Sequence, residues 1–308
     1  MEHLELLLPP HENNRAAGRQ PAVKTPCRPC SLADPAVRAL MADDRGELYN
    51  WVLYTYTLAT TIEESSVNIP QLSEANLDLL RKNDSPTICN VIEVFKNRSQ
   101  TEGYMDTRIT ACFPEMPPMV GYAATATFRS AAPPRGGNIY ASLDAQVKQF
   151  AELPQPVVVV FQDLDDPSVA ATFGEVMTSC YKGFGAAGMI TSGAARDIDQ
   201  VRAIGFPCFA DGIICSHGYP HFVDLNVPVN VGGITVHPGD LIHGDCNGVT
   251  TIPHEIASAV ARSCEEFAAA EQVVIDYVRS GSPTAEGLGK VRAQCGAMIQ
   301  ALGERVRG

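Results

Sequence analysis

The run PVVVVFQDLDD, residues 156–166, constrains the fold of this chain more than any other segment. Four consecutive valines and a phenylalanine leave no polar residue to face water on either side of a strand. A continuous apolar, β-branched run of this kind is typical of a strand that is covered on both faces, as in the parallel sheets of α/β proteins. The run therefore predicts an α/β fold with this strand at its centre.

Three aspartates, Asp163, Asp165 and Asp166, follow the run at the point where a strand would leave its sheet. Their hard carboxylate oxygens could hold a metal ion. Acids after a buried strand are more often a solvated turn and a helix cap, and Pro167 suits the first turn of a helix. We favour the turn and cap.

Helical and extended patterns alternate around this strand, which predicts one α/β domain over residues 71–308. We expect Ser73 and Ser85 to cap the first two helices. Helices are expected within 72–84, 85–98, the second half of 136–153, 168–186, 197–205, 254–278 and 284–306. Strands are expected at 120–130, 187–193, 206–213 and through a β-rich block at 223–253, with a hairpin turn at Gly232–Gly233.

Residues 1–70 differ from the rest and are expected to be a poorly ordered N-terminal extension. The stretch at 9–30 is rich in proline and polar residues and has no periodicity, which is typical of disorder. It ends in Cys27 and Cys30, a CxxC pair far from other potential ligands and therefore weak evidence for zinc or redox chemistry.

The formal net charge of -12 argues against nucleic acid or an anionic membrane surface as a partner. The ten cysteines are scattered, mostly in apolar surroundings, which indicates buried reduced thiols. Together with the absence of a recognisable export signal, this predicts a cytoplasmic protein.

A second stretch, GEVMTSCYKGFGAAGMITSGAARD, places twenty residues between Glu175 and the pair Arg196 and Asp197. Arginine offers a planar fork that holds a carboxylate through two hydrogen bonds. Aspartate offers the hard oxygen that Mg²⁺ prefers, and a helix start offers free backbone N–H groups for an anion. The set suits an oxyacid bound to a metal, although a surface ion pair and a helix-start glutamate would show the same spacing.

This spacing resembles the signature of the RraA-like family, which includes class II aldolases acting on 4-hydroxy-4-methyl-2-oxoglutarate and 4-carboxy-4-hydroxy-2-oxoadipate, and regulators of ribonuclease E. Further motifs agree in the same order, from roughly residue 72 to 261: FGEVM, GAARDIDQVRAIGFPCFA and LNVPVNVGGITVHPGDLIHGDCNGVTTIPHEIA. The resemblance implies an α/β sandwich with a swivelling β/β/α core. It also implies a homotrimer or a hexamer made of two trimers, with active sites between subunits.

The resemblance also implies the roles of individual residues. Asp197 would bind a divalent cation, Mg²⁺ or Mn²⁺, and Arg196 would hold the keto oxygen or carboxylate of a 2-keto acid. Glu175 would orient a water molecule and carry the proton. Backbone N–H groups of Gly174, Glu175, Val176 and Met177 would bind a substrate carboxylate. The implied reaction is metal-dependent cleavage of a C–C bond next to a 2-keto acid, which releases pyruvate, with oxaloacetate decarboxylation as a side activity.

Three features depart from the family pattern. Ser192 stands where many members carry an acid, Glu175 is one methylene longer than the expected Asp, and no motif selects the acid that a neighbouring subunit would lend. Candidates for that acid are Glu265, Glu266 and Glu271.

Four residues in or just before the β-rich block invite a metal-site interpretation: His217, His221, His243 and Asp245. Gly218 and Pro220 argue against the helix that would align the first two, so we expect these histidines at a pocket mouth or a subunit contact. His243 and Asp245 fit a structural turn better, with a pocket role for His243 as the alternative.

The residues thus favour a metal-dependent lyase. A non-catalytic, protein-binding regulator of the ribonuclease E inhibitor type is the alternative. An enzyme for another oxyacid is the third possibility, because Ser192 and the long N-terminal segment set this chain apart.

Overall fold

The computed structural model describes residues 69–136 and 141–308. The expected N-terminal extension, including Cys27 and Cys30, lies outside the described residues except for its last two positions. Within the described ranges, none of the helices has the length and apolar character needed to cross a membrane.

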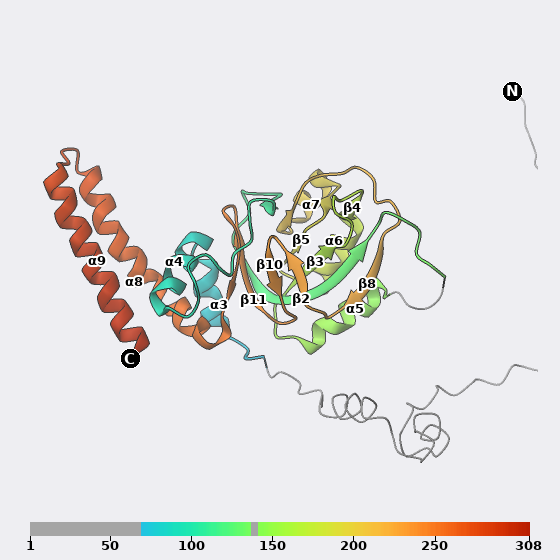
Figure 1. Cartoon of the computed structure of the whole chain (residues 1–308), viewed down its shortest axis with the longest axis horizontal. Helices are drawn as coiled ribbons and strands as arrows, with labels where there is room; N and C mark the ends of the chain where they lie inside the picture. The colour runs from blue at the N-terminus through green and yellow to red at the C-terminus, as the bar shows by residue number, and fades with distance from the viewer. Residues whose placement is uncertain (1–68, 137–140) are drawn as a thin grey trace, which may run out of the picture. The chain divides into compact units, whose positions relative to one another are not determined.

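An eight-stranded, strongly curved sheet forms the body of the domain (Figure 1). The strand order is β1 (Thr110–Ala111), β7 (Cys208–Ala210), β5 (Gly188–Thr191), β3 (Val157–Asp163), β2 (Met119–Arg129), β11 (Leu241–Asp245) and β12 (Gly248–Ile252). The strands β2, β3, β5 and β7 run parallel, whereas β1, β11 and β12 pair antiparallel with their neighbours. β8 (His221–Leu225) pairs with the far end of the long β2. The α/β prediction is confirmed.

The predicted central strand is β3, and its residues supply two separate cores. Val157, Val159 and Phe161 pack on one side of the sheet, against helices α5 (Leu143–Gln149), α6 (Glu175–Gly183) and α7 (Ile198–Ile204). Val158 and Val160 pack on the other side, against the hairpin of β9 (Val229–Val231) and β10 (Ile234–Val236). All five side chains have zero exposed area, which explains why the run contains no polar residue.

The hairpin between β9 and β10 turns at Gly232 and Gly233, as predicted. Both glycines have positive φ, 57° and 78°. Two consecutive residues with positive φ are what a two-residue hairpin turn of the favoured twist requires, and glycine adopts that conformation without strain.

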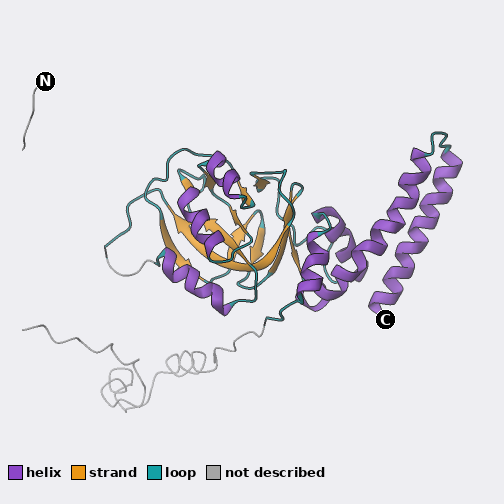
Figure 2. Ribbon diagram, turned by 180° about the vertical axis from the view of Figure 1, so that it is seen from behind, coloured by secondary structure: helices purple, strands orange, loops and turns teal. Residues whose placement is uncertain are grey.

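Four helices lie at the other end of the domain (Figure 2): α3 (Glu74–Arg81), α4 (Ser85–Phe95), α8 (His254–Arg279) and α9 (Ala285–Arg307). They pack against β2 and β11 through a third core that includes Leu80, Val91 and Val260. Beyond this core, α8 and α9 continue as an antiparallel pair that extends away from the sheet (Figure 1). An ion pair between Glu266 of α8 and Arg305 of α9 joins the two helices.

Three local predictions are wrong. Asp84, not Ser85, caps α4, because the Asp84 carboxylate accepts the backbone N–H of Thr87 at 2.8 Å. The helix expected over 168–186 begins only at Glu175, since Ala171–Phe173 forms strand β4, which pairs with β6 (Ala194–Ala195). The favoured helix cap after Asp166 is therefore wrong as well: residues 164–170 form bends that lead into β4.

Ser85 instead takes part in a buried network around His243. The Ser85 hydroxyl lies 2.9 Å from His243 Nδ1, and His243 Nε2 lies 3.1 Å from the carbonyl oxygens of both Leu80 and Asn83. Because carbonyl oxygens only accept, Nε2 carries the hydrogen and Nδ1 accepts from Ser85. Asp245 accepts the Ser85 backbone N–H at 3.0 Å. These contacts fasten the start of α4 to the β11–β12 hairpin, in agreement with the structural interpretation of His243 and Asp245.

Burial lowers the pKa of His243, since its fully buried imidazole is disfavoured in the charged form. In the unfolded chain a histidine binds a proton below about pH 6.5, whereas folded His243 stays neutral to lower pH. The unfolded state then binds more protons, so we expect the free energy of unfolding to fall by up to about 1.4 kcal/mol per pH unit below pH 6.5.

Urea denaturation at pH 7.5 and 5.5 checks this expectation. His243→Gln should be less stable at pH 7.5 but lose less stability on acidification than the wild-type chain. His237→Gln removes an exposed histidine and should leave the wild-type pH dependence unchanged. The same pH dependence in all three proteins would contradict the assignment.

Candidate functional site

The ends of β4 and β6 bring the two halves of the predicted site together. The two strands run parallel, with Ala171 paired to Ala194 and Phe173 to Ala195. The backbone N–H of Arg196 donates to the Phe173 carbonyl at 3.2 Å. The start of α6 and the pair Arg196–Asp197 therefore leave the paired strands side by side, although twenty residues separate Glu175 from Arg196.

Asp197 connects these two segments directly. Its Oδ2 accepts the backbone N–H of Glu175 at 3.0 Å, which ties the start of α7 to the first turn of α6. Asp197 adopts a left-handed conformation with φ of 55°, one of three described non-glycine residues with positive φ. Such a conformation is uncommon outside glycine and is more accessible to Asp and Asn than to most residues.

Gly174 makes the close approach possible. A Cβ atom at this position would lie 2.4 Å from Asp197 Oδ2 and 3.1 Å from Arg196 Nε. The carbonyl oxygen of Gly174 accepts the side-chain hydroxyl of Thr178 at 3.0 Å and its backbone N–H at 3.1 Å, so the turn is held from inside α6. No pattern in the sequence indicates this role of Thr178.

A cavity of about 220 Å³ opens beside this turn. Its walls include Gly174, Val176, Met177 and Arg196, four of the predicted substrate-binding residues, together with His217. Within the described part of the chain, the backbone N–H groups of Val176 and Met177 have no acceptor, because a helix has no carbonyl to offer its first turn. The cavity thus combines two free N–H donors, a helix N-terminus and a guanidinium, which is a favourable environment for an anion.

The other predicted residues lie at the edge of this arrangement. Asp197 and Glu175 are not on the cavity wall, and the Glu175 side chain is exposed. Arg196 Nε and Asp197 Oδ2 are 3.9 Å apart, with about a third of each side chain exposed, so the pair is a weak one. A ligand could displace it at little cost.

Metal ligation by the two nearby histidines is not supported. His217 lies at the cavity, as expected, but its Nδ1 contacts the carbonyl of the adjacent Gly218, and His221 Nδ1 contacts that of Tyr219. Among residues 69–136 and 141–308, no three His, Cys, Asp or Glu side chains form a preassembled metal cluster. The three aspartates after β3 likewise form no such cluster.

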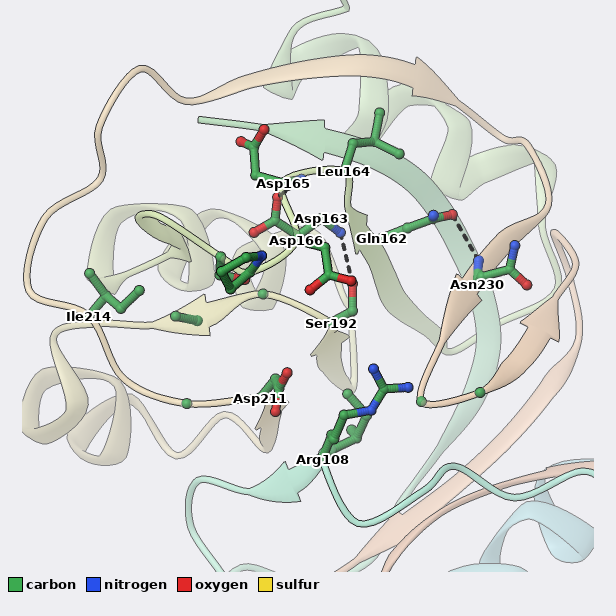
Figure 3. A pocket seen from close by; sticks show the side chains of 18 of the residues that line it. Arg108, Gln162, Asp163, Leu164, Asp165, Asp166, Ser192, Asp211, Ile214 and Asn230 are labelled. Atoms are coloured by element: carbon green, nitrogen blue, oxygen red, sulfur yellow. Dashed lines mark hydrogen bonds between the residues drawn. The ribbon is translucent and has the colours of Figure 1, made fainter. Parts of the chain in front are cut away.

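Ser192 and Asp163 belong to a different, larger cavity (Figure 3). The Ser192 hydroxyl accepts the backbone N–H of Asp163 at 2.9 Å. Ser192 thus lines this cavity and not the one beside Arg196. The candidate acids Glu265, Glu266 and Glu271 all lie on α8, where Glu266 is paired with Arg305.

The model of one protein family, RraA-like (Aldolase/RraA), matches residues 88–251. One similar curated protein carries the name "Putative 4-hydroxy-4-methyl-2-oxoglutarate aldolase", from Halalkalibacterium halodurans. It is 38% identical over 101 residues, which cover 32% of this chain and 47% of that protein. The chain thus spans about half the length of this curated relative.

Solved structures show the same fold. A Pseudomonas syringae protein superimposes with a TM-score of 0.58 at 22% identity, over 73% of this chain and 96% of that one. RraAS2 of Streptomyces coelicolor, described as an unusual member of the RNase ES inhibitor RraA protein family, gives a TM-score of 0.53 at 23% identity, over 66% and 96% of the two chains.

The contact between Gly174 and Asp197 can be tested by one added methyl group. Gly174→Ala forces its Cβ against Asp197 Oδ2, so we expect a loss of about 1–3 kcal/mol in the free energy of unfolding, measured by urea denaturation. Gly183→Ala makes the same change at the other end of α6, where nothing lies within 4 Å, and should be neutral or stabilising. Equal effects of the two substitutions would contradict the proposed close approach.

Proposed function

The chain belongs to the RraA-like family, and on that premise we propose that it is a divalent-metal-dependent lyase that releases pyruvate from a 2-keto acid of the 4-hydroxy-4-methyl-2-oxoglutarate type. The observation that carries the proposal is the meeting of the first turn of α6 with Arg196 and Asp197 beside one cavity. A chain that served only as a binding surface would not need this combination of donors.

The substrate carboxylate would bind at the start of α6. The free N–H groups of Val176 and Met177 can both donate to it, and the positive end of the helix dipole favours its charge. Arg196 lies on the same cavity wall and can donate two parallel hydrogen bonds to the keto oxygen and the carboxylate. A substrate must contact both the helix N–H groups and the Arg196 guanidinium within about 220 Å³. This arrangement therefore selects small 2-keto acids.

Asp197 fits a divalent cation, Mg²⁺ or Mn²⁺, by the chemistry of its free oxygen. Oδ2 accepts the Glu175 N–H, while Oδ1 accepts no hydrogen bond from the described residues. Mg²⁺ commonly takes one or two protein carboxylates and keeps several waters, so a single described carboxylate is compatible with it. The cation, when bound, would polarise the keto oxygen as a Lewis acid.

The reaction requires a proton to leave the C4 hydroxyl while the C3–C4 bond breaks. The electron pair of that bond passes to C3 and forms the enolate of pyruvate, and C4 becomes the carbonyl carbon of the second product. The Arg196 guanidinium would stabilise the negative charge that develops on the enolate oxygen. Addition of a proton at C3 completes pyruvate, so atoms and charge balance without an oxidant or reductant.

Glu175 would act as the proton carrier of the reaction. Its side chain is exposed at the first position of α6 and can reach a water molecule over the site. We further propose that the site lies between subunits of a homotrimer or hexamer. Glu265 and Glu271 are better candidates than Glu266 for the acid that a neighbouring subunit contributes to the site, because Glu266 is already paired with Arg305.

Pyruvate release from 4-hydroxy-4-methyl-2-oxoglutarate and from oxaloacetate tests the proposal. We expect turnover with Mg²⁺ or Mn²⁺ and none with EDTA. Asp197→Asn should lower kcat/KM at least 100-fold by removing the metal ligand, and Arg196→Lys should lower it by about 10²–10³ because the planar fork is lost.

Asp199→Asn is the matched control. It removes a carboxylate two residues further on, in α7, where Asp199 is 91% exposed and paired with Arg202. Its activity should stay within twofold of the wild-type value. Absence of turnover in a folded wild-type oligomer would overturn the lyase proposal and direct attention to the protein-binding regulator or to an enzyme for another oxyacid.

A further inference from the structure

A second cavity, of about 570 Å³, lies where β3 and β5 end (Figure 3). Its walls come from the bends after β3, the segment after β5, the loop after β7 and the β9–β10 hairpin. Neither Arg196 nor Asp197 lines it, so it is separate from the proposed lyase site. Its volume is that of a small-molecule site.

The charged side chains on its walls are four aspartates and one arginine: Asp163, Asp165, Asp166, Asp211 and Arg108. Figure 3 shows the first three grouped after β3, with Asp211 and Arg108 on another wall. The charges are not balanced, because one arginine faces four aspartates and its closest partner, Asp106, lies outside this group, although it also interacts electrostatically with Asp211 and Asp166.

Arg108 donates to both carboxylate oxygens of Asp106, at 2.8–3.2 Å. The Asp165 carboxylate also has partners outside the cavity. It accepts the backbone N–H groups of Ser130 and Ala131 at 2.7 and 2.8 Å and lies 3.3 Å from Arg129 Nε. Within the described residues, the carboxylates of Asp166 and Asp211 have no hydrogen-bond or ion-pair partner, although both are exposed. Two acids thus face the cavity with no cation in direct contact, and Arg108 interacts with both of them only at longer range.

The buried carboxylate of Asp163 is stronger evidence for a ligand than the two exposed acids, because one of its oxygens has no hydrogen-bond donor. Its side chain is only 6% exposed, and Oδ2 is buried without a hydrogen-bond partner among the described residues, while Oδ1 accepts the Asp165 N–H at 3.0 Å. Buried carboxylate oxygens are rarely left unpaired, because desolvation without a donor is costly. That burial raises the pKa of Asp163. A positively charged hydrogen-bond donor in the cavity would satisfy the orphaned oxygen.

The spacing of the acids suits an organic cation with several N–H donors. The described residues hold no group of three acids, histidines or cysteines that converges on one point. Separate carboxylates suit separate N–H donors, and apolar side chains between them suit methylene groups. Ile109, Leu164 and Ile213 provide such a lining. We propose that this cavity binds a linear aliphatic polyamine, with ammonium groups at Asp163, Asp166 and Asp211.

Isothermal titration calorimetry of the full chain with spermidine at low ionic strength tests the proposal. We expect saturable binding that weakens about tenfold or more in Asp166→Asn and in Asp211→Asn, because each loses a charge-assisted hydrogen bond. Both positions are exposed, so neither change should impair folding. Asp163→Asn should weaken binding similarly, and its thermal unfolding shows whether that variant is folded.

Asp224→Asn is the matched control, because it removes an exposed aspartate that does not line the cavity. A chain with a net charge of -12 attracts any polyamine weakly, and this variant measures that background. Its affinity should stay within twofold of wild type. Equal weakening in all variants, or no saturable binding, would overturn the proposal.

Competition with MgCl2 separates the polyamine from a metal ion. At matched ionic strength, MgCl2 should weaken spermidine binding no more than NaCl does, and stronger competition would overturn the proposal in favour of a metal site. Pyruvate release should persist in Asp166→Asn and Asp211→Asn, so a failure of this proposal and a failure of the lyase proposal give different results.

Discussion

The parallel pairing of β2 with β3 is the interaction on which the rest of the structure depends. Seven registered residue pairs, from Tyr122–Val157 to Phe128–Asp163, hold the two strands together. Because both faces of β3 are buried, a one-residue shift in this register would move valines out of one core and into the other. The segments that form both cavities leave this part of the sheet, so their geometry follows from the pairing.

Two small features convert that scaffold into a site. The missing side chain of Gly174 and the left-handed backbone of Asp197 allow a carboxylate to reach the first N–H of α6. The resulting contact occupies one oxygen of Asp197 and one N–H of the helix, and it leaves the other oxygen and the next two N–H groups free. In the proposed lyase, metal binding and anion binding would therefore use different atoms.

Much of this was predictable from the sequence, where local pattern and tertiary structure agree. The β3 run, the Gly232–Gly233 turn and the positions of Arg196 and Asp197 all follow from residue type and spacing. The predictions fail where contacts between residues far apart in the sequence determine the structure. The prediction of a helix at strand β4 is wrong, because only the pairing with β6 marks this segment as a strand. The network of Ser85 and His243 joins residues 158 positions apart, and the unpaired oxygen of Asp163 depends on burial that no local pattern reveals.

The position of β2 in the sheet also determines when its partner strands become available during synthesis. Tyr122 pairs on one side with Val157, but on the other side its partner is Leu241, 119 residues later in the chain. At roughly 5–20 residues per second, a ribosome needs about 6–24 s to add that stretch. During this interval the 119–122 end of that edge has no strand to pair with, although all four of its residues are buried in the folded domain. This end of β2, the longest strand of the described residues, is then open to association with other chains, and ribosome-associated chaperones would have most effect at that stage.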